Sequence, residues 1–182
     1  MRTPDDIYDE LLVLRRQSGD DAALVELVQR WQPRLLRHAQ RLTGAPDAAG
    51  EVVQSAWLAI LRGLHRLEDP ACFRRWAYRI VTHKCADWVR ARQRGRASTT
   101  QLSSEPIDEE SSEKSPPDDS ALLAEALKQL PPDQKAVLSM FYLDEMPLME
   151  IAEALSLPVG TVKSRLHYAR EKLKVILERN KP

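Results

Sequence analysis

Polar and basic side chains share one side of the C-terminal segment that follows Leu157-Pro158. Lys and Arg can hold phosphate oxygens or reach the acceptor atoms of guanine in the major groove, and hydroxyl groups can bind either target. Apolar residues recur at helical spacing between them, which indicates an amphipathic helix. Its outward residues are expected to be Thr161, Lys163, Ser164, Arg165, His167, Tyr168 and Arg170. This segment is therefore a candidate DNA-reading helix.

The residues around this helix fit a helix-turn-helix template over residues 148–166. Leu157 is expected to fill the turn, and Pro158 presets φ for the start of the second helix. The turn usually has Gly where Ser156 stands, because φ there is often positive, and Ser would bear about 1 kcal/mol of strain. The predicted inward positions are Ile151, Ala152, Leu155, Val162, Leu166, Ala169 and Leu173. In such a motif the second helix enters the major groove. An ordinary helical hairpin with a basic surface is the alternative.

A second basic segment, CFRRWAYRIVTHKCADWVRARQRGR, spans residues 72–96. Cationic side chains can hold the phosphates of an unpaired strand, while aromatic rings can stack on its bases. With the apolar positions turned inward, the outward or partly outward residues are Arg74, Arg75, Tyr78, Arg79, His83, Lys84, Trp88 and Arg90. A place in the core is the alternative for Trp88. The segment is a candidate single-strand-binding helix.

The charges are strongly segregated although the formal net charge is zero. Residues 62–96 carry a net charge of +7 and residues 158–182 carry +5, whereas residues 97–120 carry −6. Two basic segments separated by an acidic one indicate two contact surfaces for a polyanion. Solvated helix faces are the alternative for either segment alone.

The apolar spacing is helical almost throughout, without strand alternation, so the predicted fold class is all-α. Two small helical domains are expected, at 1–95 and 120–182. Residues 96–119 are Ser-rich, acidic and nearly devoid of large apolar residues, which predicts a flexible, disordered linker. Asp20 or Asp21 is a candidate N-cap, Pro33 should kink or restart its helix, and Asp47 is a candidate cap for the next one.

Several classes of function are disfavoured by what the sequence lacks. It contains no Gly-rich phosphate loop and no recognisable nucleophile–base pair, so we expect no enzyme and no cofactor. Cys72, His83 and Cys85 could share a face, but a closed zinc site needs a fourth ligand, so no metal is predicted. Two cysteines do not make a disulfide framework, and a reduced cytoplasmic setting is the default. The sequence contains no run of about 18 apolar residues, so no membrane span is predicted.

Three segments together resemble the bacterial RNA polymerase sigma factors of the extracytoplasmic-function type. TGAPDAAGEVVQSAWLAILRGL is similar to the family's polymerase-clamp-binding helix. FRRWAYRIVTHKCADWVRARQR resembles its promoter-melting and minus-ten-reading helix. LPPDQKAVLSMFYLDEMPLMEIAEALSLPVGTVKSRLHYAREKL resembles its minus-thirty-five-reading domain. The resemblance implies core RNA polymerase and promoter DNA as partners, and an anti-sigma factor that wedges between the domains or covers the clamp-binding helix. The apolar residues that it would contact lie at the domain rims, such as Leu64, Leu67, Phe141 and Leu143, and a place in the core is the alternative for each.

The resemblance places polymerase binding on the polar side of the segment 47–64, at Glu51, Gln54, Ser55 and Arg62. Ala48, Gly50 and Ser55 stand where the family usually carries acids, which leaves Glu51 and Gln54 as the central contacts. The alternative function is a stand-alone helix-turn-helix regulator that binds duplex DNA as a dimer. That alternative predicts a dimerisation surface and gives no role to the basic segment 72–96.

Overall fold

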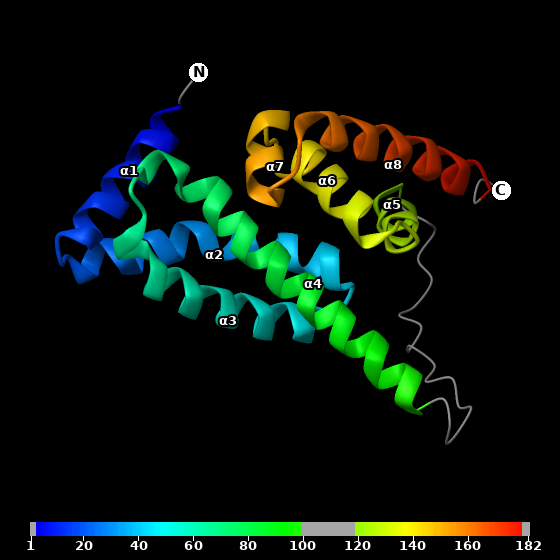
Figure 1. The fold of residues 1–182 in the computed structure, drawn as a ribbon, viewed down its shortest axis with the longest axis horizontal. Coiled ribbons are helices and arrows are strands. Elements are labelled where there is room, and N and C mark those ends of the chain that lie inside the picture. Colours follow the sequence, from blue (N-terminus) through cyan, green and yellow to red (C-terminus); the bar gives the residue numbers. More distant parts are fainter. Residues whose placement is uncertain (1–2, 100–118, 180–182) are drawn as a thin grey trace.

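The computed structural model describes residues 3–99 and 119–179, which form two groups of helices (Figure 1). The first group contains α1 (Pro4–Gln17), α2 (Asp21–Thr43), α3 (Pro46–Gly63), the short helices η1 (Leu64–Arg66) and η2 (Pro70–Cys72), and α4 (Phe73–Thr99). The second contains α5 (Asp119–Lys128), α6 (Pro132–Tyr142), α7 (Leu148–Leu155) and α8 (Val159–Arg179). Because these ranges contain helices and no strands, the all-α prediction is confirmed.

Helix α2 is the centre of the first group and packs against α1, α3 and α4. Asp20 is its N-cap, as predicted: the carboxylate accepts hydrogen bonds from Ala22 N at 2.9 Å and Ala23 N at 3.2 Å. The helix runs on through Pro33, so the expectation of a restart there was wrong. Pro33 is exposed while Trp31 and Leu35 beside it are buried, so packing on the inner face outweighs one missing backbone hydrogen bond.

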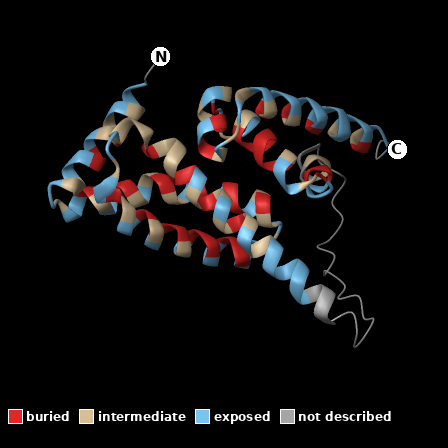
Figure 2. Ribbon diagram, in the orientation of Figure 1, coloured by how far each residue is buried: buried red, intermediate tan, exposed pale blue. Residues whose placement is uncertain are grey.

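Helix α3 begins differently from the prediction. Ala45 occupies the N-cap position without a side-chain hydrogen bond, Pro46 is the first helical residue, and Asp47 lies in the first turn. Asp47 is therefore not the cap, although a carboxylate in the first turn still interacts favourably with the helix dipole. The inward face of α3 is buried along Ala49, Val52, Val53, Ala56 and Ile60 (Figure 2).

The helix-turn-helix forms as predicted from α7 and α8. Ser156 adopts the left-handed conformation with φ of 54° and ψ of 46°. Leu157 N donates to Ala152 O at 2.9 Å across the turn. Val162, Leu166 and Ala169 are buried, and Leu173 is partly buried, so the predicted stripe of α8 faces α6 and α7.

Helix α4 continues to Thr99, past the predicted end of the first domain at residue 95. The rest of the predicted linker, residues 100–118, lies outside the described residues. The two groups of helices lie side by side, with contacts between α4 and α7, α2 and α6, and α2 and α5 (Figure 1). None of the described helices has both the length and the apolar character to cross a lipid bilayer.

The positive φ of Ser156 generates a stability prediction. Replacing Ser156 with Gly removes the steric cost of the left-handed conformation, so Ser156→Gly should raise the free energy of unfolding by about 1 kcal/mol. Urea unfolding followed by circular dichroism measures the difference. Ser156→Ala keeps a Cβ atom and serves as the matched control, which should not be stabilised. Equal stability of the Gly and Ala variants would contradict the assignment of strain to this position.

Candidate nucleic-acid and polymerase interface

The predicted DNA-reading residues of α8 lie on its outer face. Lys163, Ser164, His167, Tyr168 and Arg170 are exposed, while Thr161 and Arg165 are partly buried. The buried stripe on the opposite side of the helix fixes which residues face outward. This face therefore presents cationic groups, a hydroxyl and an aromatic ring that could meet base edges and phosphates.

Two of the α8 cations already have partners inside the C-terminal group. Arg165 Nε lies 3.3 Å from Asp133 Oδ2 at the start of α6. The guanidinium of Arg170 lies over the rings of Phe141 at 5.6 Å and Tyr142 at 5.3 Å. Arg165 is positioned at the edge of the reading face, whereas Arg170 is directed toward the end of α6.

The basic residues of α4 divide into two sets. Arg79, His83 and Arg90 are exposed and Lys84 is partly buried, so the middle of the helix presents a cationic surface. Trp88 is partly buried, and Arg92 lies 5.3 Å from its ring centroid.

The first turns of α4 face the C-terminal group instead. Arg74 donates to the backbone oxygen of Asp144, and Arg75 Nε lies 2.6 Å from Glu153 Oε2 of α7. Tyr78 is only 2% exposed, so its predicted outward position was wrong. Its ring packs edge-on against Trp31 and His38, which makes it part of the interior between α2, α4 and the C-terminal group.

A buried polar cluster joins the two groups at Asp144, in the loop between α6 and α7. His38 Nδ1 lies 2.9 Å from Asp144 Oδ2, Arg41 donates to Asp144 Oδ1, and His38 Nε2 lies 2.9 Å from Thr82 Oγ1. An ionised carboxylate only accepts hydrogen bonds, so Nδ1 of His38 carries the hydrogen. The His38 side chain is 0% exposed and that of Asp144 is 5% exposed. The imidazole and the carboxylate are thus largely removed from water, while the Arg41 side chain remains 21% exposed.

This environment changes the acid–base behaviour of Asp144 and Tyr78. Burial on its own would raise the pKa of Asp144, but the hydrogen bond and charge of His38, together with Arg41, hold that pKa below its usual value. Burial, followed by the nearby Asp144 carboxylate, raises the pKa of Tyr78. Asp144 is therefore held as an anion and Tyr78 as a neutral phenol.

The sequence pattern did not single out this cluster. His38 falls on the apolar stripe of α2 between Leu35 and Ala39, and all three residues are buried. A histidine at a core position was the one available signal, because such a group needs hydrogen-bond partners. Its partner Asp144 lies 106 residues further along the chain.

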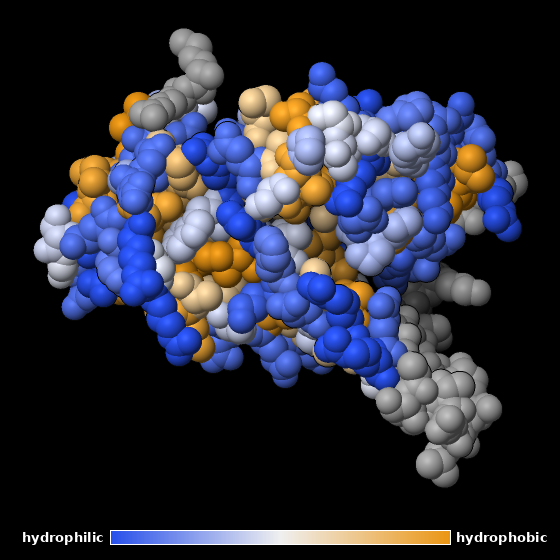
Figure 3. All heavy atoms as spheres, in the orientation of Figure 1, coloured by the Kyte–Doolittle hydropathy of each residue, from blue (hydrophilic) through white to orange (hydrophobic). Residues whose placement is uncertain are grey.

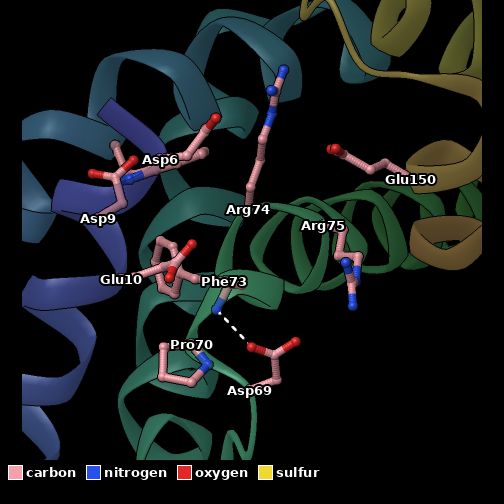
Figure 4. Close-up of a pocket in the computed structure, with 11 residues that line it drawn as sticks. Asp6, Asp9, Glu10, Asp69, Pro70, Phe73, Arg74, Arg75 and Glu150 are labelled. Carbon is pink, nitrogen blue, oxygen red and sulfur yellow. Dashed lines mark hydrogen bonds between the residues drawn. The ribbon is translucent and has the colours of Figure 1, made fainter. Parts of the chain in front are cut away.

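A polar cavity of about 240 Å³ lies beside the start of α4 (Figure 4). Asp6, Asp9 and Glu10 of α1 line one side, and Glu150 of α7 also contributes to the lining. Figure 4 shows Arg74 and Arg75 extending from the start of α4 in opposite directions. Two cations of α4 and carboxylates from both groups of helices thus line one cavity.

The polar side of α3 presents the predicted polymerase-binding residues together with apolar ones. Glu51, Gln54 and Arg62 are exposed and Ser55 is partly buried. Leu58 is 51% exposed and Leu61 is 38% exposed. The surface is therefore mixed, with leucines among the polar side chains.

The thiols lie in environments that disfavour thiolate formation. Burial raises the pKa of Cys85 to about 12. Burial and a hydrogen bond to Asp69 raise the pKa of Cys72 to about 11. Within residues 3–99 and 119–179, no group of three or more His, Cys, Asp or Glu side chains is arranged to hold a metal ion.

Comparisons with known proteins agree with this arrangement of helices. Residues 27–95 match the family model of Sigma-70 region 2, and residues 120–173 match that of Sigma-70, region 4. The RNA polymerase sigma-E factor of Streptomyces coelicolor is 32% identical over 86% of this chain and 86% of its own. The ECF RNA polymerase sigma-E factor of Escherichia coli is 32% identical over 91% of this chain and 92% of its own.

Solved structures show the same fold. CnrH in complex with the cytosolic domain of CnrY superposes with a TM-score of 0.72 at 25% identity, covering 96% of this chain and 99% of that one. The sigma factor RpoE of Bartonella quintana, solved with the anti-sigma factor NepR, superposes with a TM-score of 0.70 at 20% identity, over 87% of this chain and 98% of its own.

Fold and sequence together define a sigma-70-type protein with regions 2 and 4. The chain belongs to the extracytoplasmic-function family of RNA polymerase sigma factors, which direct promoter-specific transcription initiation. The stand-alone regulator is not favoured, because the match to region 2 accounts for the basic segment on α4 that such a regulator leaves without a role.

The lowered pKa of Asp144 generates a prediction about acid. A carboxyl whose pKa is lower in the folded state stabilises that state above its unfolded pKa, and this stabilisation is lost as the pH falls through the folded pKa. Asp144→Asn should therefore be less stable than the wild type near neutral pH, and the difference should shrink as the pH falls below about 4. Urea unfolding at several pH values measures it. A difference that stays constant down to about pH 2.5 would contradict the assignment.

Proposed function

We propose that the chain uses three separate helix faces as a sigma factor. The outer face of α8 reads the upstream, minus-thirty-five promoter element, and the basic face of α4 holds the minus-ten region and its melted strand. The polar side of α3 docks on the polymerase clamp. The observation that carries this proposal is the outward position of Lys163, Arg79 and Glu51 on these three helices, over buried faces that fix the orientation of each.

The proposal assigns different work to the two promoter-binding helices. On α8, Lys163 and Arg165 reach guanine or phosphate, while the other outward residues hold the backbone and set register. On α4, Arg79, His83 and Arg90 hold phosphates, and Trp88 is the aromatic group available for a base once its side chain turns outward. Tyr78 is left out of this set because it is buried.

The chain works as two domains in this proposal, at 1–95 and 120–182, with residues 96–119 as the tether. The tether lets each domain meet its own promoter element while both stay on one polymerase. The partners are core RNA polymerase and promoter DNA. The polymerase does the chemistry, and the chain itself is not an enzyme. Its place of action is the cytoplasm, where it meets polymerase and DNA.

An anti-sigma factor is the proposed regulator. Two proteins of the same fold, CnrH and the sigma factor RpoE, have been solved with the cytosolic domain of CnrY and with the anti-sigma factor NepR, respectively. Exposed apolar side chains near the end of α6, Tyr142 and Leu143, are candidate contacts, since both are more than 40% exposed. Of the other rim residues predicted for this role, Leu67 and Phe141 are partly buried, whereas Leu64 is in the core.

Promoter reading by α8 is tested with the variant Lys163→Ala/Arg165→Ala. Each good base contact contributes about 1–3 kcal/mol of discrimination, so the double variant should lose at least about tenfold in promoter affinity. Run-off transcription and mobility shifts with holoenzyme, on a promoter that the wild-type chain directs, give the measurement. Lys174→Ala, an exposed cation further along α8, is the control. Unchanged promoter output from the double variant would refute the assignment of α8.

Clamp docking by α3 is tested with Glu51→Lys. Reversing a charge at a complementary interface places like charges together, so core polymerase affinity should fall by about tenfold or more. Competition for core polymerase against the wild-type chain measures it. Asp21→Lys makes the same charge change at the exposed start of α2 and should compete like the wild type. Equal competition by Glu51→Lys and Asp21→Lys would remove α3 from the docking surface.

A further inference from the structure

The loop that carries Asp144 has a fixed shape before it meets α2 and α4. Asp144 N donates to Ser139 O at 3.0 Å and Met146 N donates to Met140 O at 2.9 Å, which ties both sides of the loop to α6. Glu145 adopts a left-handed conformation with φ of 51°, and Met146 is 1% exposed. The C-terminal group thus presents the Asp144 carboxylate in one orientation.

The Asp144 loop and Glu153 of α7 cover the start of α4, while the Asp144 carboxylate itself binds His38 and Arg41 of α2. Arg74 is bound by the Asp144 backbone oxygen, and Arg75 by the Glu153 carboxylate at 2.6 Å. Tyr78 is enclosed at 2% exposure. These three residues stand at the beginning of the helix to which minus-ten binding is assigned. The backbone oxygen of Asp144 and the carboxylate of Glu153 therefore hold two cations that would otherwise be available to DNA phosphates.

The contact between the groups is incompletely packed. A largely apolar cavity of about 300 Å³ lies beside it, lined by α4 at Cys85 and Val89 and by the C-terminal group at Ala136 and Leu157. On the face drawn in Figure 3, apolar surface occurs at several places, one of them in the centre of the view. A close-packed core leaves no such space. Orientation then depends strongly on the polar contacts at Asp144 and Glu153.

We propose that the C-terminal domain is an autoinhibitory cover on α4, held closed by Asp144 against His38, Arg41 and Arg74 and by Glu153 against Arg75. In the closed state the first turns of α4 are withheld from single-stranded DNA. Opening exposes Arg74, Arg75 and the buried edge at Tyr78 and frees the two domains to separate. The inference that DNA binding is inhibited rests on the proposed function of α4, whereas the packing of the two domains in the closed state does not.

The test uses the full chain without polymerase and compares wild type, Asp144→Asn and Glu153→Gln. The charge-matched control is Asp21→Asn, which removes an exposed carboxylate far from the contact. Small-angle X-ray scattering gives the radius of gyration. Fluorescence anisotropy gives affinity for a labelled 12-nucleotide single-stranded DNA of mixed sequence. Circular dichroism checks that each variant is folded, and Glu153, whose side chain is 50% exposed, supplies a variant that cannot disturb the core.

Asp144→Asn should increase the radius of gyration and tighten DNA binding by about tenfold, because the covered state no longer dominates. Glu153→Gln should move both quantities in the same direction by a smaller amount. Asp21→Asn should leave the radius unchanged and alter affinity by less than about twofold. An unchanged radius of gyration in folded Asp144→Asn would overturn the proposal that Asp144 holds the closed state. An affinity gain no larger than that of Asp21→Asn would overturn the cover.

A further variant separates failure of the cover from failure of the proposed function. Arg79 is exposed on α4 beyond the covered turns, so Arg79→Ala should weaken DNA binding in both the wild-type and the Asp144→Asn backgrounds. Unaltered binding in both would show that α4 does not hold DNA, which refutes its assigned role and the cover with it. The radius of gyration would still decide whether Asp144 holds the domains together.

Discussion

The buried stripe of α2 is the constraint on which the other surfaces depend. Leu27 and Leu35 are fully buried and Trp31 is 1% exposed, and burying each such side chain contributes about 1.5–3 kcal/mol. The Trp31 ring meets Phe73 edge-on at 5.4 Å and Tyr78 at 6.2 Å, so this residue positions the first turns of α4. Helices α1 and α3 pack on the same helix. The orientation of every functional face in the first domain follows from this stripe.

The far end of the same helix connects that domain to the C-terminal one. His38 continues the buried stripe but carries two ring nitrogens that must find partners, and it finds one in each domain: Thr82 of α4 and Asp144. Arg41, one turn further, adds the opposite charge that a buried carboxylate requires. Removing one partner of a buried ion pair leaves an uncompensated charge, which costs much stability. These polar contacts therefore fix the geometry of the junction, although the surrounding apolar packing is incomplete.

Signals from neighbouring residues made most of the fold predictable, and contacts between residues distant in the sequence explain the errors. The Asp20 cap and the positive φ of Ser156 are set by neighbouring residues, so the sequence pattern identified both. The position of Tyr78 depends on Trp31 and His38 of α2 and on Asp144 of the other group, all distant in the sequence, and helical periodicity carries no information about those contacts. The residues of the Asp144 cluster were missed for the same reason.

Acidic residues of the C-terminal group partly neutralise cations of the first group, Glu153 at Arg75 of α4 and Asp144 at Arg41 of α2. Glu153 is half exposed, so its ion pair with Arg75 is weakened by salt, whose screening length is about 10 Å at 0.1 M. Asp144 is enclosed and is screened far less. A nucleic-acid strand can therefore compete first at the rim of the contact, where Arg75 exchanges a carboxylate for a phosphate. The enclosed contacts at Asp144 then determine how readily the domains part.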